Sequence, residues 1–365
     1  MANTFLTSDL IAKEALVRLQ NNLVMGNLVH RDFDNEFANV GDTIQVKVPN
    51  TFEAKDFTTE VEAQEIKESK VLVKLDKVAD VTVEVSAKEM ALNIQDFGQT
   101  IVQPAMEAIA QKIDAELCGL YSDIPYISGE AATTPAALSD IANVRKVLNE
   151  NKVPLGNRRL VMDSEAEAKL IVLDAIAGAD KSGTTQALRE AEMGRILGFN
   201  TYADQNIKSH VKGTAATFNV AGTAGQSTLA VTTATNAHTF KKGDVISVTG
   251  VAQKFAVIED VAVASTIATV KVSEPVKTTF TAAAGTLLGN HVASLGFHRN
   301  AFGLVTRNLA LPMGGGANGS IMNYGGLSIR VTSGYAMASK INTLSFDILY
   351  GCRVLDPTLA VRFLG

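Results

Sequence analysis

Alternation of apolar and polar residues marks the first β-rich region of the chain, between residues 40 and 86. In three short runs every second residue is apolar, which is the pattern of a half-buried strand. The apolar members are Ile44, Val46, Val48, Val71, Val73, Leu75, Val81, Val83 and Val85. The pattern predicts three strands, the first two antiparallel and joined by a long segment. Pro49 should end the first strand, because proline lacks the N–H that a ladder needs.

Apolar residues at helical spacing predict two long helices in the first third of the chain. Residues 7–29 form an amphipathic pattern that starts at possible N-caps and suits an arm packed on another element. Residues 97–121 carry an apolar stripe, and a helix of about 20 residues would span roughly 30 Å. Pro104 lies early in this pattern, so we expect a start near residue 100 or a kink.

The pattern then changes twice more. Residues 135–207 alternate between helical and strand-like stretches, with Asp163 or Ser164 as the N-cap of one helix, and predict a compact α/β region. Residues 213–291 lose helical periodicity and show short runs of Val, Ile and Thr between Gly turns, which predicts an all-β insert. After residue 292 strand patterns return and continue to the end.

A charged segment separates the first two predicted strands. The segment covers residues 51–70. Connections of about twenty residues between two strands are uncommon and usually functional. We interpret it as a hairpin arm that reaches a neighbouring molecule, although a solvated loop is the simpler alternative.

The paired arginines of the sequence NRRL (157–160) suit a helix end or a subunit contact. The residues predicted to make intersubunit contacts are Glu53, Lys55, Asp56, Glu60, Glu62, Glu65, Lys67, Glu68, Arg158 and Arg159.

The sequence Gly-Asp-x-Ile-x-Val occurs twice, at Gly41–Asp42 and at Gly243–Asp244. Gly tolerates the positive φ of a tight turn, and Asp can accept hydrogen bonds from the backbone beyond it. The flanking sequences differ, which argues against a duplicated domain. We therefore predict two separate turns, the first starting a strand of the charged hairpin and the second starting a strand of the β-rich insert.

Composition narrows the class of protein. Hydrophobic residues make up 46% of the 365 residues, enough for a sizeable core, while charged residues make up only 19%. The formal net charge of −5 argues against a protein whose main task is to grip nucleic acid. The start shows no signal peptide and no apolar run is long enough to span a bilayer, so we expect no membrane association and a reducing cytoplasm. Two distant cysteines, Cys118 and Cys352, suit small buried apolar side chains.

A search for catalytic or ligand-binding patterns finds none that holds. There is no phosphate-binding loop, no H-E-x-x-H and no G-x-S-x-G. DFDNE begins like a calcium loop, but Phe37 stands where glycine is required. The five histidines lack metal-ligand spacing, and we expect them at the surface or in interfaces. The sequence thus predicts no catalytic, cofactor-binding or metal-binding residue, no cofactor and no enzyme activity.

Three segments, in this order, carry a family resemblance. MGRILGFNTYADQNI (193–207), FHRNAFGLVTRNL (297–309) and YGCRVLDPTLAVRFLG (350–365) are similar to strands of the HK97-fold major capsid proteins of tailed bacteriophages. The β-rich insert resembles the insertion domain of P22-type coat proteins. The resemblance implies an α+β capsid fold with an N-terminal arm (1–39), E-loop strands (40–86), a peripheral domain with spine helix (87–134), an axial α/β region (135–212), an all-β insertion domain (213–291) and C-terminal strands (292–365).

The family also implies partners and location. Subunits would form hexamers and pentamers of an icosahedral head, assembled in the host bacterial cytoplasm, that encloses double-stranded DNA without sequence-specific binding. A separate scaffolding protein, a portal protein and a decoration protein would be its partners, and its place would be the virion. The alternative within the same fold is an encapsulin-like bacterial compartment. An enzyme with a scattered site and a surface adhesin are the alternatives outside it.

Overall fold

The computed structural model describes residues 8–31, 43–48, 69–85, 98–178, 189–233, 238–263, 266–312, 318–336 and 341–365. Contacts between residues divide the chain into two compact units, each assembled from separated parts of the sequence. The first unit comprises Met1–Leu23, His30–Ile113 and Phe302–Leu355. The second comprises Val24–Val29, Asp114–Ala301 and Asp356–Gly365.

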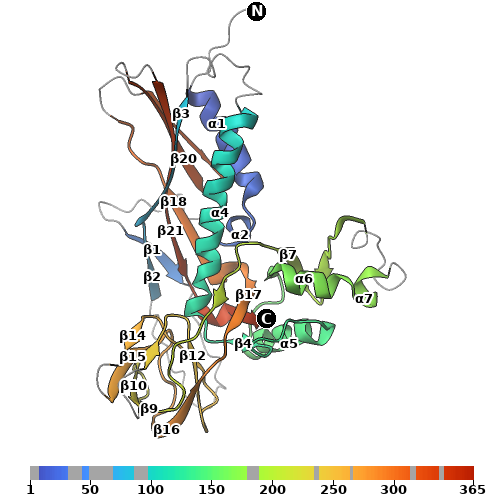
Figure 1. Ribbon diagram of the computed structural model, residues 1–365, viewed down its shortest axis with the longest axis vertical. Helices are drawn as coiled ribbons and strands as arrows, with labels where there is room; N and C mark the ends of the chain where they lie inside the picture. The colour runs from blue at the N-terminus through green and yellow to red at the C-terminus, as the bar shows by residue number, and fades with distance from the viewer. Residues whose placement is uncertain are drawn as a thin grey trace, which may run out of the picture. The chain divides into compact units, whose positions relative to one another are not determined.

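A five-stranded antiparallel sheet forms the first unit, and its central strand is β21, Ile341–Val354 (Figure 1). β3 pairs with one edge of β21 along residues 342–350. β20 pairs with the other edge and with β19 beyond it, and β18 pairs with the end of β21. The bounds of these strands are Lys77–Val85 for β3, Phe302–Arg307 for β18, Asn318–Tyr324 for β19 and Leu327–Ala336 for β20.

The strands that flank the charged segment form a separate two-stranded sheet in the same unit. β1, Thr43–Val48, pairs with β2, Ser69–Lys74, in an unbroken antiparallel register. The predicted antiparallel pair is thereby confirmed. The charged residues between them, Glu53 to Glu68, lie outside the described residues, as do Gly41 and Asp42.

The predicted N-terminal helix is shorter than expected. α1 spans Ser8–Asn22 and packs on β19 and β20. A separate short helix, α2, spans Met25–Leu28 in the second unit. Asp114, distant in sequence, accepts hydrogen bonds from the backbone N–H groups of Val24 (2.7 Å) and Gly26 (2.8 Å). These bonds fix the turn that ends the first helix, and burial raises the pKa of Asp114 to about 6.

The predicted spine helix is confirmed as α4, Gln103–Gly119, and the boundary between the two units falls within it. Its stripe of Ala105, Ile109, Ile113 and Leu117 is buried. A π-helical turn over Gly98–Val102 precedes it, so Pro104, which has no N–H to donate, stands just after the change from π-helical to α-helical hydrogen bonding. A 3₁₀ turn, Leu120–Asp123, follows it.

The second unit contains a mixed sheet with strand order β4–β22–β17–β5–β7–β6, and β8 pairs with β17. Asp163 caps α6 as predicted, because its side chain accepts a hydrogen bond from the Glu165 N–H at 3.1 Å. The helix predicted over residues 164–177 is two helices, α6 and α7. The bounds are β4 Ile127–Ser128, α5 Leu138–Glu150, β5 Arg158–Met162, α6 Ser164–Ile171, α7 Asp174–Ala177, β6 Arg195–Ile196, β7 Phe199–Ala203, β8 Ser209–His210, β17 His291–His298 and β22 Ala360–Leu364, with 3₁₀ turns at Arg299–Ala301 and Pro357–Leu359.

Strands β9 to β16 of the second unit, which we call the β module, are drawn in yellow to orange in Figure 1. Six of them form a sheet in the order β13–β12–β16–β9–β10–β15, and β11 pairs with β14. The module has its own hydrophobic core, which includes Phe218, Phe240 and Phe255. The bounds are β9 Phe218–Gly222, β10 Thr228–Thr233, β11 Thr239–Phe240, β12 Val245–Val248, β13 Phe255–Ala256, β14 Val261–Ala262, β15 Ile267–Lys271 and β16 Phe280–Leu287.

Candidate functional site

The two arginines predicted to contact another subunit have different surroundings. Arg158 is buried, and it donates from Nε to the Pro154 carbonyl at 2.9 Å and from Nη2 to the Val153 carbonyl at 2.6 Å. Its guanidinium therefore holds the chain that leaves α5, which favours the helix-end alternative. Arg159 is half-buried, and its subunit contact stays a prediction.

The second Gly-Asp turn lies in the β module and is fully described. Gly243 has φ +96°, the left-handed region that glycine tolerates. The buried carboxylate of Asp244 accepts hydrogen bonds from the backbone N–H groups of Lys241 (2.8 Å) and Gly213 (3.1 Å). The carboxylate thus joins the turn before β12 to the segment that leads into the module.

Asp244 also belongs to a buried polar cluster, which we call the junction cluster: Tyr121, His210, Asp244, His291 and Arg362. Its carboxylate lies 2.9 Å from His210 Nε2, and a carboxylate can only accept, so the imidazole N–H donates. The other imidazole nitrogen, Nδ1, lies 2.9 Å from the Tyr121 hydroxyl. The rings of His210 and His291 lie 5.2 Å apart between centroids.

Arg362, on the last strand of the chain, completes the junction cluster. The side chain is fully buried and donates from Nη1 to the Gly243 carbonyl at 2.6 Å and from Nη2 to the Ser122 carbonyl at 3.1 Å. Its guanidinium also lies 5.2 Å from the centre of the Tyr121 ring. β22 is therefore bound directly to the Gly243 turn and to the end of the spine helix.

Burial shifts the titration of several groups in the junction cluster. It raises the pKa of Tyr121 and lowers the pKa of Arg362 to about 10, which leaves the guanidinium charged at neutral pH. It lowers the pKa of His291 to about 4, helped by the positive charge of Arg362. His291 is therefore neutral at pH 7, and the cluster avoids two facing cations.

The expectation that the histidines lie at the surface is wrong for three of them. His210, His291 and His298 are all buried within the chain. His210 binds Tyr121 and Asp244, which are distant in sequence, whereas His291 and His298 form hydrogen bonds with the backbone two residues away. Their burial comes from strand packing, which spacing along the chain does not signal. The junction cluster has no access to solvent for a substrate, and its arrangement supports a structural role that fixes the β module to β17 and β22.

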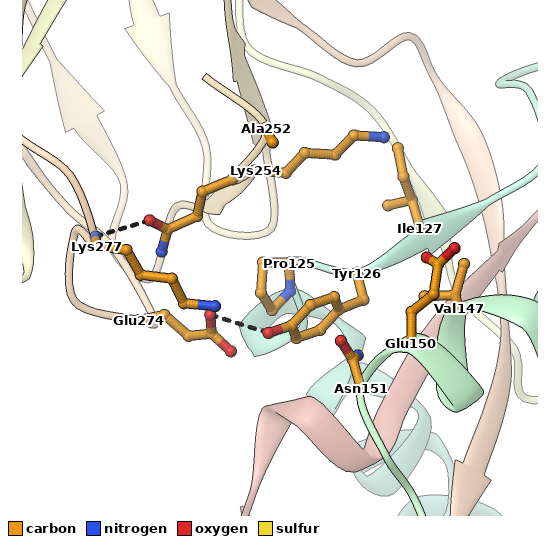
Figure 2. A pocket seen from close by; sticks show the side chains of 11 residues that line it. Pro125, Tyr126, Ile127, Val147, Glu150, Asn151, Ala252, Lys254, Glu274 and Lys277 are labelled. Carbon is orange, nitrogen blue, oxygen red and sulfur yellow. Dashed lines mark hydrogen bonds between the residues drawn. The ribbon is translucent and has the colours of Figure 1, made fainter.

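A pocket of about 360 Å³ lies in the second unit, between the β module and the α5–β4 region (Figure 2). The Tyr126 hydroxyl donates to Glu274 at 3.2 Å across it. Burial raises the pKa of Glu274 and lowers the pKa of Lys254. Two amines and two carboxylates balance each other in its lining, so the pocket selects neither anions nor cations. It is lined by Pro125, Tyr126, Ile127, Val147, Glu150, Asn151, Ala252, Gln253, Lys254, Glu274 and Lys277.

The residues that the structure describes hold no candidate metal site and no membrane-spanning helix. In this part of the chain no three His, Cys, Asp or Glu side chains gather as a metal site. No described helix is long and apolar enough to cross a membrane. Cys118 is buried as expected, whereas Cys352 is half-buried.

No protein-family model matches the chain, and no curated protein matches it. Among solved structures, one from Mycobacterium phage Che8 is similar over 93% of this chain and 90% of that chain, with 15% identity and a TM-score of 0.53. The capsid structure of the cyanophage P-SCSP1u covers 93% and 87%, with 13% identity and a TM-score of 0.48. A virus-like particle from Pyrococcus furiosus covers 96% of both chains, with 10% identity and a TM-score of 0.40.

The first of these likenesses extends over nearly the whole chain and defines its fold. The chain is a mixed α+β protein, as the sequence predicted, and shares its fold with the Che8 phage structure. The P22-type assignment, the insertion domain as a separately folding unit and the six-part division of the chain stay predictions.

Proposed function

We propose that this chain is the major shell subunit of a tailed-phage head. The observation that carries the proposal is the likeness to the Che8 phage structure across 93% of the chain. In this proposal subunits form hexamers and pentamers that close into an icosahedral shell around double-stranded DNA, and the protein resides in the virion. A closed shell needs many modest repeated contacts and no catalysis.

The physical features of the chain support this role. The described residues form a long sheet beside α1, a spine helix and a separate β module with its own core. Charged residues are only 19% of the sequence, which leaves weakly polar surface for contacts between copies. A scaffolding protein, a portal protein and a decoration protein are the further partners we propose, with assembly in the host cytoplasm.

The charged segment between β1 and β2 is the proposed contact arm. Its support is the antiparallel pair that presents both ends of the segment together, and its mixed charge of six acids and two bases between Glu53 and Glu68. Mixed charges set register and make assembly sensitive to salt more than they add affinity. Gly41 belongs to the turn that is predicted to start the first strand of this arm. Gly41→Val should reduce the yield of particles, measured by sedimentation, while the subunit stays folded, as judged by circular dichroism.

Expression of the chain with its scaffolding protein, followed by negative-stain electron microscopy, tests the proposal. Uniform closed particles or free capsomers are the expected result. A protein that stays monomeric under every assembly condition tried would overturn it. Neighbouring genes that encode an enzyme, in place of a terminase and a portal protein, would instead indicate the encapsulin-like alternative.

A further inference from the structure

A row of polar side chains crosses the sheet of the first unit. Arg330 on β20 lies directly opposite Asp347 on β21, and Asp347 lies directly opposite Asp80 on β3. Asp347 is buried, whereas Asp80 is exposed on the edge strand. Like charges directly opposite each other destabilise a sheet, so two ionised carboxylates here require an explanation.

Ser345 lies between the two carboxyl groups and shows that a proton is needed. Its hydroxyl oxygen is 2.7 Å from Asp80 Oδ1 and 2.9 Å from Asp347 Oδ1. A serine hydroxyl has one proton and can donate to only one of them. If both carboxyls were ionised, the other short contact would join two acceptors. A proton on Asp347 completes the row of hydrogen bonds, because the Asp347 carboxyl then donates to Ser345 and the Ser345 hydroxyl donates to Asp80.

The groups that face the pair agree with this placement of the proton. Thr82 donates to Asp80 at 3.1 Å, which favours the charge on Asp80. The pKa of Asp80 is lowered, first by its hydrogen bond with Asp347, and the pKa of Asp347 is raised, first by burial. Arg330 donates to Asp347 Oδ2 from Nε (2.9 Å) and Nη2 (2.6 Å), which a carbonyl oxygen of a neutral acid also accepts.

We propose that Asp80 and Asp347 share one proton and make the attachment of edge strand β3 to the sheet sensitive to pH. Asp347 holds its proton more tightly in the folded state than in the unfolded state. Its contribution to the stability of the folded sheet is therefore lost as pH rises through its folded pKa. Two negative charges then face each other across the strands. β3 follows β1 and β2 in the chain, so the device loosens the strand next to that hairpin.

Amide hydrogen exchange of the full chain, measured by mass spectrometry between pH 4 and pH 9 and corrected for intrinsic rates, tests the proposal. Peptides from β3 should lose protection by up to roughly fivefold as pH rises, which is the size of effect expected for like charges directly opposite each other in a sheet. Peptides from β19, at the other edge of the same sheet, are the internal reference and should stay constant.

Two variants and a control separate the shared proton from general structure. Asp347→Asn carries a permanent N–H donor in place of the acid proton and should abolish the pH dependence of β3. Asp80→Asn removes the facing charge and should do the same, and its exposed position preserves folding. Glu84→Gln, an exposed acid on the same strand, should keep the wild-type dependence. Unchanged β3 protection across pH in the wild type, or a persistent dependence in both Asn variants, would overturn the proposal.

Discussion

The junction cluster and the Asp80–Asp347 pair place charged groups in sheets under opposite conditions. In the junction cluster, Arg362 is fully buried and bound to two backbone carbonyls. In the carboxyl pair, one acid lies on an exposed edge strand and its partner is buried. In the first arrangement the buried guanidinium stays charged at neutral pH, whereas the second gains or loses a proton at the sheet edge.

The two regions differ in pH dependence because different groups stabilise the charge in each. Carbonyl oxygens do not titrate, so a buried guanidinium that they bind stays charged and fixed. A carboxyl that faces another carboxyl depends on a proton, so its stability varies with pH. The comparison predicts large losses of stability when Arg362 or the Gly243 turn is changed, and smaller changes in stability when the carboxyl pair at β3 is changed.

Arg362→Met should produce the largest loss. The substitution leaves the Gly243 and Ser122 carbonyls without a donor, and we expect the free energy of unfolding to fall by about 3 to 5 kcal/mol. Urea denaturation of the wild type and the variant measures this difference in the free energy of unfolding. Arg353→Met is the matched control, because that exposed arginine also binds a carbonyl, Leu72, at 2.6 Å. Its loss should stay within about 1 kcal/mol; equal losses would contradict the role of burial.

Gly243→Val should be nearly as damaging. A side chain at φ +96° is strained, and its Cβ would lie 3.1 Å from His210 Cε1 and 3.3 Å from Ser122 Cβ. We expect a loss of about 3 kcal/mol from strain and displaced packing. Gly250→Val has a similar φ of +81° with nothing within 4 Å. Thermal unfolding should separate the two variants, and matching midpoints would show that only backbone strain matters.

His291 should make the second unit less stable in acid. Its folded pKa of about 4 lies below the ordinary value of 6.5, so stability is present above pH 6.5 and is lost as pH falls toward 4. We expect a loss of about 3 kcal/mol between pH 7 and pH 4, which follows from the difference between the folded and the ordinary pKa. The difference in unfolding free energy between wild type and His291→Leu, measured at pH 7 and pH 4, isolates this contribution. A difference that does not change with pH would contradict it.

Asp80→Asn should have the smallest effect on overall stability. The side chain is exposed. The substitution removes a negative charge that faces Asp347, but it also removes a hydrogen-bond acceptor. We therefore expect the free energy of unfolding to change by no more than about 1 kcal/mol at pH 7. Denaturation at pH 7 measures it. A loss as large as that of Arg362→Met would remove the distinction between the two regions.

Local pattern in the sequence was sufficient for most of the regular elements. Period-two alternation located β1, β2 and β3, and the apolar stripe located α4. Asp163 was recognisable as a cap because N-caps act within a few residues. The order of the segments along the chain was sufficient to predict the α+β fold class.

Contacts between distant residues could not be predicted in the same way. The end of α1 depends on Asp114, about ninety residues away in sequence. Arg362 reads as one polar residue in an apolar strand, and its partners Ser122 and Gly243 lie in other elements. His210 and His291 are buried because β8 pairs with β17, and that pairing leaves no spacing signal. The contact arm itself is predicted from charge, and its residues lie outside those described.

A cryo-electron microscopy reconstruction of particles assembled with the scaffolding protein tests the central claim most directly. The account predicts a closed icosahedral shell whose subunits are arranged as hexamers and pentamers, with one copy of this fold at each position. A particle without that symmetry, or a chain that assembles into no particle at all, would contradict it.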